Sequence, residues 1–210
     1  MVAASDAGAD LDSRARCPWA SGPWLRPYHD HEWGVPVHQD DQHLELLVLE
    51  GAQAGLSWLT ILRRREGYRK AFARFVPEQV ANFTDRQVVA LLADIGIIRH
   101  RQKIEAAIAN ARALLMIQDA KGSFDEYIWS FVEGIPLINH WRTLEEVPSL
   151  SDLSRRLSAD LRRRGFRFVG PTVCYSYLQA SGLINDHLTS CYRFHELAAQ
   201  VDPTVDSSGS

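Results

Sequence analysis

The sequence contains little cysteine and no long apolar segment, and both shortages limit where the protein works. Its 210 residues include 3 cysteines, which are too few, and odd in number, for the disulfide framework of a small secreted protein. No run of about 18 apolar residues could span a bilayer. The first 16 residues carry aspartates in place of the apolar core of a signal peptide. We therefore expect a cytoplasmic protein with no membrane segment, whose thiols are reduced or bind metal.

An excess of positive charge is also missing. The net charge of −3 argues neither for nor against a nucleic-acid partner, so the distribution of the charges matters more. Arginines crowd into one short stretch: Arg155, Arg156, Arg162, Arg163, Arg164 and Arg167. Most basic runs are solvated helix faces, so this stretch alone is weak evidence for binding to nucleic acid.

What remains is an ordinary globular composition, with 46% hydrophobic and 23% charged residues. A chain of this length can bury one substantial core, in one domain or in two closely packed lobes. The ends, residues 1–16 and 201–210, are small and polar and show no helical or strand-like period. We expect disordered tails there and a folded domain over residues 17–200.

Apolar residues recur at helical spacing through most of the chain, while strand-like alternation is nearly absent. Helices are predicted from Asp40 to near Gly51, from Ser57 through Phe72, after the Thr84–Gln87 capping box, over Ile104–Leu115, after Ser123, after Ser151 and after Pro171. The expected fold class is all-α.

Residues 164–172 join two of these helical patterns through Gly165 and Gly170, and Pro171 suits the first turn of the second helix. The segment is typical of a tight hairpin between helices. Backbone N–H groups at such a turn can bind a DNA phosphate without reading sequence, which makes Gly165, Gly170 and Thr172 candidate DNA-binding residues. The glycine spacing alone fits an ordinary helix–helix corner better.

Four segments, taken in order, resemble the DNA-3-methyladenine glycosylase I family. They are YHDHEWGVP, LEGAQAGLSWLTILRRREGYRKAF, IGIIRHRQKIEAAIANAR and RGFRFVGPTVCYSYLQASGLINDH. The resemblance covers about Cys17 to Tyr192 without large gaps. It implies a diverged helix–hairpin–helix glycosylase of two helical lobes with a base pocket between them. The implied activity is excision of 3-methyladenine from double-stranded alkylated DNA in base excision repair, by a monomer that releases the free base.

Two Cys/His pairs are candidate metal ligands. Cys17 and His29 precede the first predicted core helix, and His187 and Cys191 lie four residues apart, a spacing that puts both on one face if the segment is helical. Two thiolates and two imidazoles suit a closed tetrahedral zinc site, which is structural. Buried cysteines and surface histidines are common without metal.

Spacing alone leaves other histidines open as ligands, because His31 sits beside His29 and His195 lies four residues after Cys191. The resemblance places the family's zinc positions on Cys17, His29, His187 and Cys191. It implies one structural zinc ion that ties the N-terminal segment to the C-terminal one. The third cysteine, Cys174, stands in an apolar helical stripe and is expected in the core.

A protein that acts on a base has to extrude it and hold it by stacking and by hydrogen bonds to its edge. Tyr28, Trp33 and Trp58 are candidate walls, and Glu50 follows an apolar stretch as the candidate polar anchor. Aromatic residues more often pack in the core, and a glutamate more often lies on the surface of a helix. The resemblance assigns base contacts to Glu50 and Trp58, supports Tyr28 and Trp33 as pocket lining, and makes Glu50 the candidate catalytic residue.

One residue departs from the family pattern. Leu25 stands where the family has a second tyrosine, and Trp24 is the neighbouring aromatic residue that could substitute for it. Gly55 and Leu56 are candidates for filling the gap that an extruded base leaves in the duplex.

Methylation at N3 leaves the attached adenine cationic, so it departs as a neutral molecule and strong acid–base chemistry is unnecessary. Asn185 replaces the aspartate that the wider superfamily carries near the hairpin, and Thr172 replaces the lysine of bifunctional relatives. The expected reaction is monofunctional hydrolysis without a Schiff base. Two alternatives stay open: a module that only binds damaged DNA, and a zinc hydrolase whose metal keeps a water ligand.

Overall fold

The computed structural model describes residues 13–201, and this part of the chain is mostly helical. The α-helices are α1 (Gly22–His31), α2 (Asp40–Gln53), α3 (Trp58–Leu62), α4 (Arg65–Ala71), α5 (Pro77–Ala81), α6 (Asp85–Ala93), α7 (Arg101–Lys121), α8 (Phe124–Trp129), α9 (Asp152–Arg163), α10 (Pro171–Ala180) and α11 (Tyr192–Val201). Short 3₁₀ helices lie between them at Ala73–Phe75, Ser130–Val132 and Leu144–Glu146. Two short strands, β1 (Leu137–Ile138) and β2 (Ile184–Asn185), pair in parallel. The expected helical fold class is confirmed.

The expected tails at residues 1–16 and 201–210 lie largely outside the described residues. Residues 13–16 have no regular secondary structure, yet the Arg16 side chain donates hydrogen bonds to Asp30. Val201 is the last residue of α11. None of the described helices is both long enough and apolar enough to cross a bilayer.

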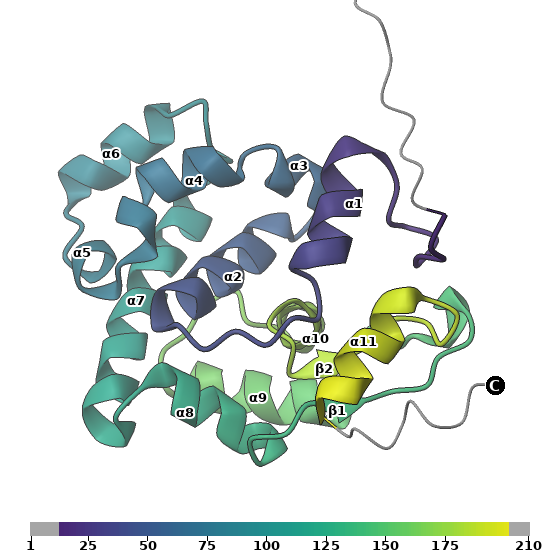
Figure 1. Cartoon of the computed structure of the whole chain (residues 1–210). Coiled ribbons are helices and arrows are strands. Elements are labelled where there is room, and N and C mark those ends of the chain that lie inside the picture. Colours follow the sequence, from purple (N-terminus) through teal and green to yellow (C-terminus); the bar gives the residue numbers. More distant parts are fainter. Residues whose placement is uncertain (1–12, 202–210) are drawn as a thin grey trace, which may run out of the picture.

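Helix α2 lies at the centre of the fold (Figure 1). Its residues from His43 to Ala52 are all buried, because α7, α10, α3 and α8 pack around it. A helix that is covered on every side holds few polar groups without a partner. This buried stretch nevertheless contains two acids, Glu45 and Glu50, and their surroundings differ.

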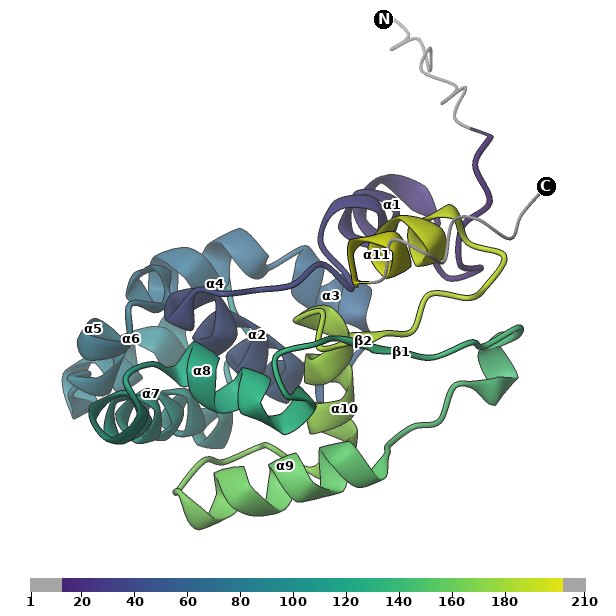
Figure 2. The ribbon, with the colours of Figure 1, turned by 60° about the horizontal axis from the view of Figure 1, so that its bottom comes forward.

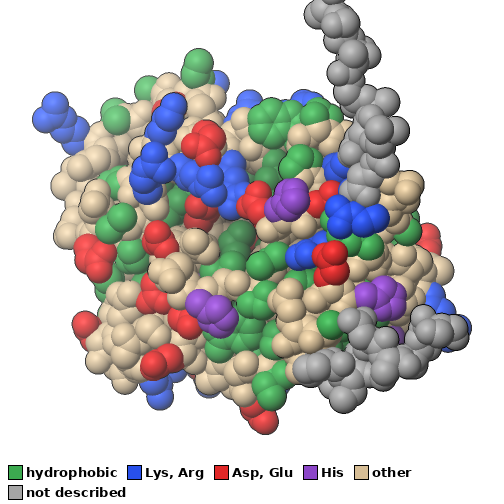
Figure 3. All heavy atoms as spheres, in the orientation of Figure 1, with side chains coloured by type: hydrophobic (Ala, Val, Ile, Leu, Met, Phe, Trp, Pro, Cys, Tyr) green, Lys and Arg blue, Asp and Glu red, His purple; other side chains and the backbone are tan. Residues whose placement is uncertain are grey.

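Glu45 belongs to an ion-pair network on one face of the molecule. Arg65 of α4 bridges Glu45 and Glu32, and Arg69 pairs with Glu45 and Glu66. Figure 3 shows basic and acidic side chains side by side in the region of α4. Arg65 and Glu45 are only 16% and 9% exposed, so the network that links α4, α2 and the end of α1 is less screened by solvent than a surface pair.

The predicted helix starts are confirmed by their caps. The Ser57, Ser123 and Ser151 side chains each accept a hydrogen bond from the third residue of the following helix. Thr84 and Gln87 form the expected capping box. Pro171 is the first residue of α10.

The single helix predicted from Ser57 through Phe72 is wrong. It breaks after Leu62, and α4 begins at Arg65. Arg65 stands where the apolar stripe would need an apolar side chain, and the break brings its guanidinium to the acids of the ion-pair network. Helix α1 was not predicted, because it contains Pro27, which ordinarily ends a helix.

The two ends of the described chain meet beside α1 and α11, which lie close together in Figures 1 and 2. The Tyr192 N–H donates to the Ala15 carbonyl at 2.9 Å. A small second core of Cys17, Leu188 and Cys191 forms between these ends. On the other side, α9 packs against α10, as Figure 2 shows.

Candidate functional site

One cavity of about 490 Å³ brings together the four residues that the sequence indicates for base binding. This volume suits a small-molecule ligand. Its walls come from α1, α2, α3, α10 and the loops beside them: Trp19, Leu25, Tyr28, Trp33, Glu50, Gln53, Ser57, Trp58, Leu59, Leu144, Val147, Ser176, Gln179 and Asp186.

Glu50 is the unpaired acid of this cavity. Its side chain is 5% exposed, and no residue in the described part of the chain donates a hydrogen bond to it. Burial alone raises the pKa of Glu50 from 4.5 to about 8. Buried polar groups almost always have a partner, so a lone carboxyl group facing a cavity is suited to a ligand that supplies one.

Aromatic rings form much of the remaining wall. Tyr28 is 4% exposed, and its ring centroid lies 5.3 Å from that of Trp58. Trp33 packs edge-on against Trp19 at 5.0 Å. Burial, followed by the negative charge of Glu50, raises the pKa of Tyr28 well above its usual value. The cavity therefore offers flat apolar faces around one acid, which suits a planar base.

Trp19 is a wall residue that sequence reasoning missed. It comes two residues after Cys17, and only the folding of the N-terminal segment onto α1 brings it to the cavity. Trp24, the neighbouring aromatic residue that could substitute for the missing family tyrosine, is 47% exposed and does not line the cavity. Leu25 lines the cavity, and Trp19 contributes an aromatic ring to the same cavity.

Asp186 is a second missed residue. Its side chain is 3% exposed and accepts four hydrogen bonds: from Asn139 at 2.7 Å, Trp141 at 2.8 Å, Tyr175 at 2.5 Å and Gln179 at 2.8 Å. Its lone pairs are thus occupied, unlike those of Glu50. This carboxylate ties the loop after β1 to α10 and fixes that wall of the cavity.

Asn185, which replaces the superfamily aspartate, has a structural role. Its side chain donates to the Phe194 carbonyl at 3.2 Å and accepts from the His187 N–H at 3.2 Å. It does not line the cavity that contains Glu50. Its two bonds instead shape the backbone next to His187.

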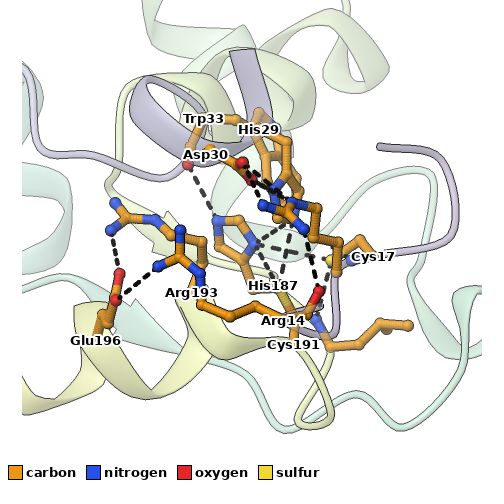
Figure 4. Close-up of polar contacts among 11 residues, drawn as sticks. Arg14, Cys17, His29, Asp30, Trp33, His187, Cys191, Arg193 and Glu196 are labelled. Carbon is orange, nitrogen blue, oxygen red and sulfur yellow. Dashed lines mark hydrogen bonds and ion pairs between the residues drawn. The ribbon is translucent and has the colours of Figure 1, made fainter. Parts of the chain in front are cut away.

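The four residues indicated as metal ligands come together in one buried cluster. Figure 4 shows the side chains of Cys17, His29, His187 and Cys191 pointing toward one another, with all ligand atoms within 4.8 Å. His31 and His195, which spacing left open, lie outside it, and His195 bonds instead to the Thr189 carbonyl.

The spacing of the ligand atoms fits a tetrahedral zinc ion. With Zn–S of about 2.3 Å and Zn–N of about 2.0–2.1 Å, two nitrogens lie about 3.4 Å apart and a nitrogen and a sulfur about 3.6 Å. The His29 Nε2–His187 Nδ1 distance is 3.2 Å, and three of the sulfur–nitrogen distances are 3.4, 3.6 and 3.7 Å. These four buried residues could therefore hold a metal ion.

The outer nitrogens of both histidines are held as metal-bound imidazoles usually are. His29 Nδ1 lies 2.8 Å from Asp30 Oδ1, and His187 Nε2 lies 3.0 Å from the Trp33 carbonyl. Burial tends to raise the pKa of Asp30, but hydrogen bonds from Arg16 and His29 lower it to about 2. The pKa of the Cys191 thiol is lowered, chiefly by a hydrogen bond from Cys17, which favours a thiolate. Cys174 is buried in the main core, as expected.

The metal cluster and the cavity share a wall. Trp19 packs edge-on against His29 at 5.2 Å, and Trp33 packs against His187 at 4.5 Å. Both tryptophans also line the cavity. The meeting of the chain ends therefore builds part of the candidate ligand site.

The predicted hairpin connects α9 to α10. Gly165 has a φ of +94°, as a left-handed turn requires, and Phe168 also has a positive φ of +54°. Among the described residues, no acceptor takes the N–H groups of Phe168, Val169 or Gly170. Thr172 is exposed in the first turn of α10. Since Ser176 and Gln179 of α10 line the cavity, one helix connects the hairpin to the ligand site.

The loop after α2 is exposed and lies beside the cavity. Gly55 has a φ of +82° with open space around it, and Leu56 is 40% exposed. Lys103 of α7 donates to the Ala52 and Ala54 carbonyls at 2.8 and 2.7 Å. This lysine caps the C-terminal end of α2 and fixes the start of the loop.

The helical fold is that of the solved 3-methyladenine DNA glycosylases. A crystal structure of 3-methyladenine DNA glycosylase I superposes with a TM-score of 0.82 at 47% identity, over 85% of this chain and 98% of that one. The Staphylococcus aureus enzyme also gives a TM-score of 0.82, at 39% identity over 84% of this chain and 95% of that one.

Sequence comparison gives the family. The methyladenine glycosylase family model matches residues 19–194. DNA-3-methyladenine glycosylase 1 of Escherichia coli K12 is 48% identical over 177 residues, which cover 84% of this chain and 95% of the relative. The DNA-3-methyladenine glycosylase of Haemophilus influenzae is 43% identical, over 84% of this chain and 96% of the relative. The chain belongs to the methyladenine glycosylase family.

Proposed function

We propose that the protein is a DNA-3-methyladenine glycosylase, which hydrolyses the N-glycosidic bond of 3-methyladenine in double-stranded alkylated DNA and releases the free base. The observation that carries this proposal is Glu50, a buried carboxyl group that lies in an aromatic cavity and has no hydrogen-bond partner within residues 13–201. Relatives named for this activity share 43–48% of their residues with the chain, and one solved relative, 38% identical, is in complex with 3-methyladenine.

In this function the target base leaves the duplex and enters the cavity. Tyr28, Trp33 and Trp58 provide faces for stacking, and Glu50 contacts the edge of the base as the catalytic residue. The ionised carboxylate attracts a cationic methylated base, and an indole face adds about 0.5–2 kcal/mol of cation–π attraction. Neutral adenine gains neither interaction, so the cavity favours the lesion.

The raised pKa of Glu50 couples binding of the base to the release of a proton. With a pKa of about 8, most empty cavities hold the protonated acid at pH 7. A cationic base next to Glu50 favours the ionised form. Binding of the cation therefore releases a proton.

The chemistry requires little further machinery, because the methylated base departs as a neutral molecule. Water attacks the sugar, and no lysine stands at the hairpin, where Thr172 is exposed. Lys103, which is near the cavity loop, is engaged with two carbonyl groups. The reaction is monofunctional: the DNA strand stays intact at the abasic site until alkali is added.

The hairpin binds the DNA backbone in this account. The N–H groups of Phe168 and Gly170 would meet a phosphate, with Gly165 shaping the turn and Thr172 beside it. The arginines before the turn add long-range attraction. Leu56 and Gly55, exposed in the loop next to the cavity, fill the gap in the duplex.

The metal is one zinc ion held by Cys17, His29, His187 and Cys191. Four protein ligands close the coordination sphere, so the ion supplies stability and no reactive water. It ties the N-terminal segment to the C-terminal one within a single glycosylase domain, a monomer with helical lobes on the two sides of the cavity.

Release of bases from methylated duplex DNA tests the function. Chromatography of the products should show free 3-methyladenine and an intact strand that breaks only with alkali. A protein that binds methylated DNA and releases no base would be a binding module instead. A covalent adduct trapped by borohydride during turnover would contradict the monofunctional mechanism.

A further inference from the structure

Buried polar side chains hold the hairpin backbone from neighbouring helices. Asn110, in the middle of α7, donates its amide N–H to the Arg167 carbonyl at 3.1 Å and accepts from the Arg167 N–H at 2.8 Å. Its side chain is 2% exposed. Both polar groups of one hairpin residue are thus paired with one side chain 57 positions earlier in the chain.

The residue on the other side of Phe168 is held as well. Ser158 of α9, 2% exposed, donates its hydroxyl to the Val169 carbonyl at 2.6 Å. Cys174 of α10 also approaches that carbonyl, at 3.4 Å. The carbonyls of residues 167 and 169 are therefore turned inward and paired within the protein.

Between these two fixed residues, Phe168 adopts a left-handed backbone with a φ of +54°. This conformation costs a bulky residue energy and persists only where the surroundings enforce it. The Asn110 and Ser158 hydrogen bonds enforce it here. With the flanking carbonyls bound inside, the N–H groups of the half-buried Phe168 and Gly170 are left for an outside acceptor, while Val169 itself is buried.

Asn110 has no other task in the described structure. Its neighbours on the buried side of α7 are apolar, among them Ala107, Ala111 and Leu114. An amide buried in such a place is costly unless both of its polar atoms are satisfied. Its hydrogen bonds go to Arg167 alone.

We infer that Asn110 is a positioning residue for DNA binding, and that Ser158 assists it. Together they fix the hairpin backbone so that its free N–H groups meet a phosphate without a conformational search. The inference rests on the proposed function, in which this hairpin binds DNA. It assigns affinity for the DNA backbone to a side chain that touches no nucleic acid.

The test compares two serines on one helix. Ser158→Ala removes a hydrogen bond to the hairpin, whereas Ser154→Ala, one turn earlier and equally buried, removes only bonds to Ser151 at the helix cap. Asn110→Ala and Asn110→Asp complete the set. The probe is a duplex that contains a stable abasic-site analogue, measured beside binding of free 3-methyladenine and the melting temperature.

We expect Asn110→Ala and Ser158→Ala to weaken duplex binding by about tenfold and to raise KM for methylated DNA. The rate at saturating DNA and the affinity for free 3-methyladenine should stay within about twofold of wild type. Ser154→Ala should change only the melting temperature. Asn110→Asp keeps the acceptor for the Arg167 N–H but repels its carbonyl, so its duplex affinity should also fall.

Duplex affinity that stays at the wild-type level in both Asn110→Ala and Ser158→Ala overturns the inference. A parallel loss of 3-methyladenine affinity also overturns it, because that pattern marks general damage to the fold. If the Asn110 variants do not fold, Ser158→Ala against Ser154→Ala decides. A wild-type protein that binds the duplex but neither binds 3-methyladenine nor excises it contradicts the proposed function, and the affinities of the variants still decide the positioning role.

Discussion

At the scale of single residues, Glu45 and Glu50 show how differently two acids on one helix are used. Both are buried on α2. Glu45 is paired with Arg65 and Arg69, while Glu50 has no partner in the described structure, and burial raises its pKa. Sites that bind ligands often retain such unfavourable groups at a cost in stability. Glu50 is therefore better explained by ligand binding than by folding.

Glu50→Gln should make the protein more stable, and the gain should depend on pH. An acid whose folded pKa is raised destabilises the fold as it ionises, so wild-type stability falls between the unfolded value of 4.5 and the folded value of about 8. The variant escapes this loss, which is on the order of a few kcal/mol above pH 8. Melting temperatures of both proteins from pH 4 to 9 check this. A difference that does not change with pH would contradict the assigned pKa.

Sequence reasoning found Glu50, Tyr28, Trp33 and Trp58 as members of one site, and the cavity contains all four. It missed Trp19 and Asp186, for different reasons. Trp19 reaches the cavity only through the folding of the N-terminal segment. Asp186 is defined by four donors from distant positions, and no local pattern encodes such a set.

At the scale of secondary-structure elements, local signals predicted helix starts and failed at a helix break. The cap at Ser57 is visible in the sequence because its partners are the next few residues. The break before Arg65 depends on Glu32 and Glu45, which are 33 and 20 residues away. Such tertiary ion pairs override local helical periodicity and cannot be recognised from it.

The hairpin contains two glycines with different tasks, and substitutions separate them. Gly165 has a φ of +94°, so Gly165→Ala should cost about 1 kcal/mol of stability or more. At Gly170 a new Cβ meets only the Arg162 side chain, at an ordinary 3.5 Å. Gly170→Ala should therefore keep the melting temperature and weaken DNA binding, since its methyl group would stand between the backbone and a phosphate.

Thermal melts and duplex-binding titrations of the two variants check this pair. Wild-type DNA affinity in Gly170→Ala would show that the phosphate does not approach the backbone at this residue. A large fall in its melting temperature would show that the glycine serves the fold.

At the scale of the whole molecule, the fold closes where its two ends meet. Cys17 and His29 come from the beginning of the described chain, and the other two ligands come from its end: Cys191 lies 162 positions after His29, and His187 lies 170 positions after Cys17. The sequence indicated the pairs, but His31 and His195 had the same claim by spacing. Only the folded arrangement, with all four ligand atoms within 4.8 Å, excludes these two from the cluster.

Cys191→Ala should lose the metal and lower the melting temperature, because binding energy at such a site is also folding energy. Affinity for 3-methyladenine should fall as well, since Trp19 and Trp33 pack on the ligand histidines. Cys174→Ala is the matched control: this cysteine is equally buried but lies in the main core, so the variant should keep its metal. Elemental analysis and melting curves with and without a chelator check both variants. A folded, active wild-type protein without zinc would falsify the metal assignment.

The role of Glu50 in base recognition is tested most directly by single-turnover excision of 3-methyladenine from methylated duplex DNA. The proteins compared are the wild type, Glu50→Ala and Glu50→Gln. The wild type should release the free base. Glu50→Ala should bind DNA and metal normally and excise more slowly by about 1–3 kcal/mol, the value of a charge-assisted hydrogen bond. Glu50→Gln keeps the shape of the side chain and removes its charge, so its loss measures the electrostatic part alone. Wild-type rates in Glu50→Ala would contradict the account, because they would place base recognition outside this cavity.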